Sequence, residues 1–214
     1  SPDLNDALAA LQREVQRRLG SCIMRLQQYE RLMKAMVAHM AVEGTPAQLQ
    51  ATLDRQMATA HTKTLGTLVG TFTSDFLTAA VPEGMAEPDD AGDGQDFPDQ
   101  VWFKTRYQVA MPPERHEQAR LALAELVAMR NDLVHHFLDR FDLWTENGCQ
   151  AADVYLDGCY SQIDGHFVTL QGWARGMDKV RAALVRFMQS PQGQDAIFHG
   201  ILPDRSVQWP SSTI

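Results

Sequence analysis

The amino-acid sequence predicts an all-α fold: a bundle of four or five long helices, mostly antiparallel, with a small β element and one flexible acidic loop. Two observations predict it. Apolar residues recur at three- and four-residue spacings over most of the chain, which is typical of amphipathic helices. Prolines and glycines gather at a few places between these runs, where they interrupt helices. With 214 residues and 44% hydrophobic content, we expect one domain over residues 1–214 with one sizeable core.

The first two helices are predicted from the N-terminal third of the chain. Residues 3–42 form one long amphipathic helix, which a Gly-Ser pair at 20–21 could kink or divide. Gly44 ends it, and the sequence Thr-Pro-Ala-Gln at 45–48 is typical of a capping box. A second helix therefore starts there and continues to Phe76, although its threonines and glycines lower its helix propensity.

Residues 81–100 are predicted to be a flexible acidic insertion. They include three prolines and seven acidic residues but no lysine or arginine, a composition that disfavours packing. Residues 101–109 then alternate in polarity and are rich in β-branched and aromatic side chains, which favours a short strand. Its partner is expected in the segment before the loop or in the same strand of a second subunit.

Two further helices follow the insertion. Prolines at 112–113 open a helix that reaches residue 143, and Asn-Gly at 147–148 breaks the chain before the last long helix. That helix presents one apolar face over residues 152–188. The tail at 203–214 lacks a terminal packing element, so we expect it to lead into a further domain.

The net charge of −8 is unusual for a protein that binds nucleic acid. The acidic insertion accounts for most of it, because the rest of the chain has 19 basic and 20 acidic residues. Overall charge therefore neither supports nor excludes RNA as a partner. No apolar run is long enough to span a membrane and no signal peptide precedes the first helix, so a cytoplasmic protein without membrane contact is expected.

Metal and cofactor sites are not predicted. Cys22, Cys149 and Cys159 form no Cys-x-x-Cys pair, so they are expected to be buried free thiols. No two histidines lie four residues apart, as a helical zinc pair would require. The chain also lacks a glycine-rich phosphate loop and a serine nucleophile elbow.

The candidate site is the stretch 130–136 of the helix predicted at 112–143. At about 100° per residue, Arg130 lies in the middle of an apolar stripe, so its guanidinium should face a core or an interface. A guanidinium there needs a carboxylate or an anionic ligand such as phosphate. Asn131 and His135 share one flank of the helix, which places an imidazole beside a possible anion site. The stripe consists of Leu123, Val127, Val134, Phe137 and Phe141.

The spacing Arg130-Asn131-x-x-x-His135 in an all-helical chain resembles the motif of the HEPN family (higher eukaryotes and prokaryotes nucleotide-binding domains). That motif has an arginine, four to six residues and a histidine, with Asn, Asp or His favoured directly after the arginine. The resemblance implies a metal-independent endoribonuclease in which two domains pair and bring two motifs to a shared cleft. His135 would act as general base or acid, Arg130 would hold the scissile phosphate, and Asn131 would orient the histidine or the substrate.

Three neighbouring residues are weaker candidates. His136 also satisfies the spacing, but it points about 120° to the other side of Arg130. Asp132 adjoins the motif and should face away from it. Arg140 could bind the RNA backbone, although a solvated or salt-bridged arginine is the commoner case.

Three functions are consistent with these residues. The resemblance favours an endoribonuclease in a toxin–antitoxin or antiviral-defence system, with RNA and an antitoxin or partner domain as partners. The alternative is a non-catalytic module that uses the same cleft for RNA or nucleotide binding or for dimerisation. A purely structural reading makes Arg130 half of a buried ion pair. The placement of Arg130 distinguishes them, because a carboxylate sealed against it would favour the structural reading.

Overall fold

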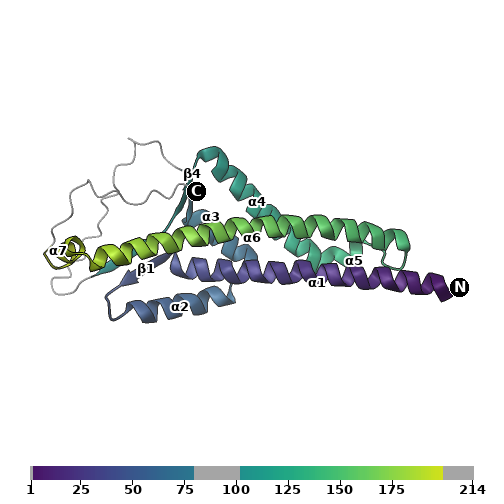
Figure 1. Cartoon of the computed structure of the whole chain (residues 1–214), viewed down its shortest axis with the longest axis horizontal. Helices are drawn as coiled ribbons and strands as arrows, with labels where there is room; N and C mark the ends of the chain where they lie inside the picture. Colours follow the sequence, from purple (N-terminus) through teal and green to yellow (C-terminus); the bar gives the residue numbers. More distant parts are fainter. Residues whose placement is uncertain (1, 80–101, 200–214) are drawn as a thin grey trace.

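The computed structural model describes residues 2–79 and 102–199. The predicted insertion at 81–100 and the tail at 203–214 lie outside these residues. The described part is predominantly helical, with two short pairs of strands, which confirms the predicted fold class. Its two longest helices, α1 (Pro2–His39) and α6 (Glu146–Gln189), lie side by side along the long axis of the molecule (Figure 1).

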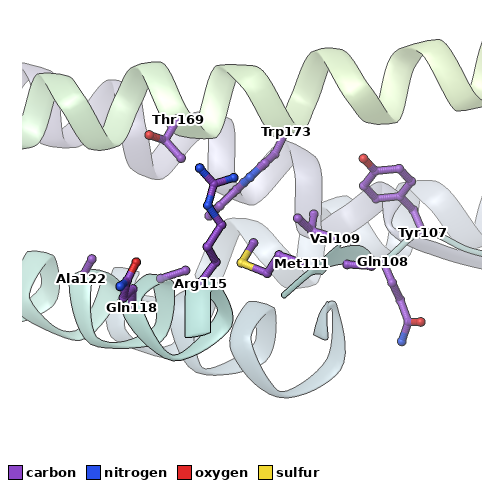
Figure 2. Close-up of a pocket in the computed structure, with 11 residues that line it drawn as sticks. Tyr107, Gln108, Val109, Met111, Arg115, Gln118, Ala122, Thr169 and Trp173 are labelled. Atoms are coloured by element: carbon purple, nitrogen blue, oxygen red, sulfur yellow. The ribbon is translucent and has the colours of Figure 1, made fainter. Parts of the chain in front are cut away.

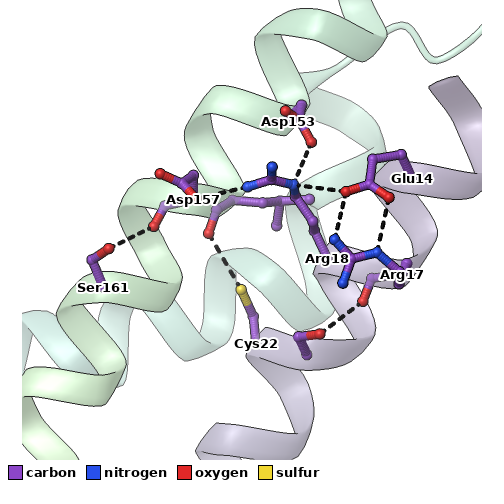
Figure 3. Close-up of polar contacts among 9 residues, drawn as sticks. Glu14, Arg17, Arg18, Cys22, Asp153, Asp157 and Ser161 are labelled. Atoms are coloured by element: carbon purple, nitrogen blue, oxygen red, sulfur yellow. Dashed lines mark hydrogen bonds and ion pairs between the residues drawn. The ribbon is translucent and has the colours of Figure 1, made fainter.

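Helices α1 and α6 run parallel to each other, which corrects the expectation of a mostly antiparallel bundle. The residue numbers of the contacting pairs increase in the same direction along both helices: Arg18 Nη1 lies 2.7 Å from Asp157 Oδ1, and Arg25 Nε lies 2.8 Å from Asp164 Oδ1. Figure 3 shows Arg18 reaching α6, where its Nε also lies 2.7 Å from Asp153 Oδ1. Short loops make sequence neighbours antiparallel, but here the intervening elements return the chain before α6 begins.

Helix α1 continues through Gly20, so the Gly-Ser pair at 20–21 does not divide it. It ends at His39, earlier than predicted, because the next residues form strand β1 (Ala41–Gly44). Gly44 has a φ of 146°, a conformation that favours glycine. The predicted capping box does not begin the next helix, because that helix starts at Leu49 and its N-cap, Gln48, makes no capping hydrogen bond through its side chain. Only the bond from the Thr45 N–H to Gln48 Oε1, at 3.4 Å, is present.

The second predicted helix is divided into α2 (Leu49–Thr62) and α3 (Leu65–Asp75). Thr64 between them is extended, and its hydroxyl accepts a hydrogen bond from the Thr67 N–H at 3.4 Å. This geometry is an N-cap. The threonines that lower helix propensity therefore also begin a new helix.

The strand predicted at 101–109 is found as two strands. β3 (Phe103–Arg106) pairs antiparallel with β1, a partner that was not predicted. β4 (Val109–Met111) pairs parallel with β2 (Leu77–Ala79), which lies in the segment before the insertion, as expected.

The helix that holds the motif consists of α4 (Pro113–Asn131), a π-helical turn η1 (Asp132–His136) and α5 (Phe137–Arg140). It runs in the opposite direction to α1 and α6 (Figure 1). It ends at Arg140, before the predicted residue 143. The Asn-Gly pair at 147–148 does not separate two helices but lies in the first turn of α6. Thr145 caps α6 by accepting a hydrogen bond from the Gly148 N–H at 3.1 Å. Helix α7 (Pro191–His199) follows α6.

The core forms where α1, α3, α4 and α6 meet. Cys22, Cys149 and Cys159 are buried free thiols, as predicted. No described helix combines the length and apolar character needed to cross a membrane. The largest side chains that are almost fully buried are Tyr29, Phe72, Met33, Met36, Met40, Leu65, Leu68, Leu126, Leu156, Ile163, Leu170 and Val15.

Candidate functional site

The π-helical turn η1 determines the geometry of the motif. A π-helix closes its hydrogen bonds from residue i to i+5, so it turns less per residue than an α-helix, and side chains five residues apart lie nearer to the same side. In a regular α-helix the same two residues would be about 140° apart around the axis. Leu133 and Phe137 are each 3% exposed and anchor this turn in the core. The turn therefore brings residues 130 and 135 together on one side.

Arg130, Asn131 and His135 form a contacting cluster. Arg130 Nη1 donates to Asn131 Oδ1 at 3.1 Å and lies 3.4 Å from His135 Nε2. A neutral imidazole with its proton on Nδ1 accepts this hydrogen bond at Nε2. The structure thus joins the three residues that the sequence singled out, and it does so through the guanidinium.

Arg130 is not enclosed by the core of the single chain. Arg130 is half-buried, while Asn131 and His135 are exposed. Of the stripe, Leu123 and Phe137 are buried, whereas Val134 is 46% exposed. Within residues 2–79 and 102–199, no carboxylate forms an ion pair with Arg130. The structural reading of Arg130 as half of a buried ion pair is therefore not supported by the described part of the chain.

His136 is placed differently from His135. Its ring centroid lies 6.3 Å from that of His135, in an edge-to-face orientation. Its Nδ1 lies 3.8 Å from Asp139 Oδ2, and both side chains are exposed. The structure gives His136 no hydrogen bond to Arg130 among the described residues, so only His135 is positioned to act with the guanidinium.

Asp132 faces away from the cluster, toward α6. Its Oδ2 accepts a hydrogen bond from Tyr155 Oη at 2.5 Å and one from Arg140 Nη1 at 3.1 Å. The Tyr155 hydroxyl, and then the Arg140 guanidinium, hold the pKa of this carboxyl below its ordinary value. Burial, followed by the hydrogen bond to Asp132, raises the pKa of Tyr155. These contacts tie the first residue of the π-helical turn to α6.

Arg140 is also part of this support. Its guanidinium carbon lies 4.3 Å from the centroid of the Tyr155 ring and 5.7 Å from that of Phe141, both cation–π distances. With one side engaged by Asp132 and the other by aromatic rings, Arg140 has a structural role here. Its expected contact with the RNA backbone stays a prediction.

Exposed apolar side chains flank the motif. Val134 and Leu138 are one helical turn apart, and Leu138 is 75% exposed. Leu138 and Trp144, which is 82% exposed, line a shallow pocket of about 560 Å³ beside the N-terminal part of α1. Large apolar side chains are therefore exposed at three positions between residues 134 and 144.

Sequence reasoning missed the two features that shape the site. Tyr155 lies on the apolar face of the last predicted helix, and nothing in the sequence gives it a role at the site. It is 23 residues from Asp132, so no local sequence pattern predicts their contact. The π-helical turn has no recognised sequence signature either. The spacing of Arg130, Asn131 and His135 on one helical segment, with its resemblance to the HEPN motif, predicted these three residues.

The chain was compared with models of protein families, with curated proteins and with solved structures, and none of the three comparisons finds a match. Among residues 2–79 and 102–199, no three His, Cys, Asp or Glu side chains lie close enough together to hold a metal ion. The assignment of function therefore depends on the geometry of the site itself.

Proposed function

We propose that this chain is a metal-independent endoribonuclease of the HEPN type, active as a homodimer in the cytoplasm and serving a toxin–antitoxin or antiviral-defence system. One observation supports it above the others: Arg130 Nη1 lies 3.4 Å from His135 Nε2 on an exposed helical turn. A cation able to hold phosphate thus lies beside an imidazole able to transfer protons.

The proposed reaction uses the ribose 2′-hydroxyl as nucleophile. His135 takes the proton of that hydroxyl as its oxygen bonds to phosphorus. The bond between phosphorus and the 5′-oxygen breaks, and the leaving oxygen receives a proton from an imidazolium. Arg130 neutralises the charge that develops on the non-bridging oxygens, and Asn131 holds the guanidinium in place. The products are a 2′,3′-cyclic phosphate and a 5′-hydroxyl.

The homodimer is proposed from the exposed apolar surface. Burying Val134, Leu138 and Trp144 against a second copy would remove large apolar side chains from water. A symmetric interface pairs each surface patch with the same patch on the partner. Such a dimer would bring two copies of the motif close together, so one imidazole could act as base and the other as acid.

Incubation of the purified protein with single-stranded RNA in EDTA tests this function. The wild type should cut the RNA, and His135→Ala should reduce the cleavage rate by about 10²- to 10⁴-fold. Arg130→Ala should reduce it by about 10²- to 10³-fold. His136→Ala is the matched control, since it removes a neighbouring exposed histidine that does not contact Arg130; it should retain most of the activity.

Two outcomes would contradict the proposal. If EDTA stops cleavage, the mechanism depends on a metal and the assigned roles are wrong. If the RNA stays intact but its complex with the protein weakens as salt rises, the site belongs to the alternative, a binding module without catalysis.

A further inference from the structure

A second feature, independent of the motif, is a groove between α4 and α6. Two pockets of about 470 Å³ and 510 Å³ lie along it. Ala119, Ala122, Thr169 and Trp173 line both pockets, so the two form one continuous depression. From Arg115 at one end to Glu125 at the other, the helical rise gives a length of about 15 Å.

Arg115 provides a positive charge at one end of the groove. Figure 2 shows its side chain leaving α4 and pointing across the pocket toward α6, with the guanidinium beside Thr169 and Trp173. In the part of the chain that the structure describes, no carboxylate or carbonyl pairs with this guanidinium. By contrast, Arg120 on the same helix is paired with Glu117 at 2.6 Å. Arg115 is therefore available to an anion.

The middle of the groove is apolar and preformed. Trp173 is stacked on Phe72, with ring centroids 5.2 Å apart, which fixes its ring in the wall. On the opposite side, the short side chains of Ala119 and Ala122 leave space in the groove. An apolar body can lie here without any rearrangement of the core.

The far end of the groove has hydrogen-bonding groups and a negative charge. Tyr29 also lines the second pocket, and its hydroxyl makes no hydrogen bond to the residues that the structure describes. This hydroxyl can therefore donate to or accept from a polar atom of a ligand. His166 beside it has a pKa lowered by burial, and its neutral ring can donate or accept. Glu125 disfavours a second anion at this end.

We propose that this groove binds a small organic anion with an apolar body. Its acidic group pairs with Arg115, its body lies against Trp173 between α4 and α6, and an uncharged polar end meets Tyr29 and His166. The charges at the two ends give the ligand one orientation. This site is separate from the Arg130–His135 cluster, and its occupancy does not depend on RNA cleavage.

Fluorescence titration with anilinonaphthalene sulfonate, an aromatic anion of this class, tests the proposal, and its uncharged analogue phenylnaphthylamine isolates the charge. The wild type should bind one anilinonaphthalene sulfonate per chain. Arg115→Gln should weaken that binding about tenfold, the loss of one charge-assisted pair, and leave phenylnaphthylamine unaffected. Ala122→Phe should fill the groove and abolish binding of both probes. Arg120→Gln is the matched control and should bind both probes as the wild type does.

Three results would overturn the proposal: no binding by the wild type, an unchanged affinity of Arg115→Gln for the sulfonate, or equal loss of both probes in Arg115→Gln. Because Arg115 is exposed, its replacement should leave the melting temperature unchanged, which separates lost binding from lost folding. Even if Ala122→Phe fails to fold, the comparison of the two probes on Arg115→Gln decides the question.

Discussion

The contact between Asp132 and Tyr155 should hold the π-helical turn against α6, and a double-mutant cycle measures how strongly. Asp132→Ala removes the acceptor and Tyr155→Phe removes the donor. A hydrogen bond to a charged group contributes about 1.5–3 kcal/mol. Since the Asp132 side chain is 29% exposed, water screens part of this, and we expect a coupling energy of about 1–2 kcal/mol.

Urea unfolding of the wild type, the two single variants and the double variant gives the coupling energy directly. Because the folded-state pKa of Asp132 lies below its ordinary value of 3.8, its contribution to the free energy of unfolding is complete above about pH 4. The contribution should disappear as the pH falls through the lowered pKa. Additive single-variant effects, or a coupling energy that does not decrease as the pH falls below 3.8, would refute the role of the charged pair.

Three further predictions follow from exposure and bonding. Arg130→Met should abolish RNA cleavage but change the free energy of unfolding, measured by thermal denaturation, by less than about 0.5 kcal/mol. A large destabilisation would indicate that Arg130 has a structural role. Leu138→Lys should weaken self-association at least about tenfold in sedimentation equilibrium, because a charge at a buried interface is costly; an unchanged dimer would place the interface elsewhere. Tyr29→Phe should leave the melting temperature equal or higher, since no hydrogen bond is lost; a drop of several degrees would reveal a hidden partner.

The elements of this fold could be predicted where their signal is local. The apolar repeat over residues 3–42 and the proline pair at 112–113 predicted α1 and α4, because an amphipathic helix repeats within a few residues. The parallel order of α1 and α6 could not be predicted, since it depends on contacts such as Arg18–Asp157, which are 139 residues apart. The same reason explains why the pairing of β1 with β3 was missed.

The site divides in the same way. Arg130, Asn131 and His135 belong to one helical segment, so their spacing and its resemblance to the HEPN motif could single them out. Their actual contact depends on a π-helical turn, and that turn is tied to α6 by Tyr155, which no local pattern connects to Asp132. Arg130 is half-buried in the single chain, so whether it faces an interface, as its place in the apolar stripe predicts, stays a prediction.

The most direct test of the central claim is the chemistry of the RNA ends. A single-stranded RNA is compared with a matched oligonucleotide that carries one 2′-deoxyribose at the mapped cleavage position, both in EDTA. If His135 and Arg130 activate the 2′-hydroxyl, the RNA should be cut to a 2′,3′-cyclic phosphate or 3′-phosphate, and the deoxy position should resist cleavage. A 3′-hydroxyl end, or cleavage at the deoxy position, would contradict the proposed role of the Arg130–His135 pair.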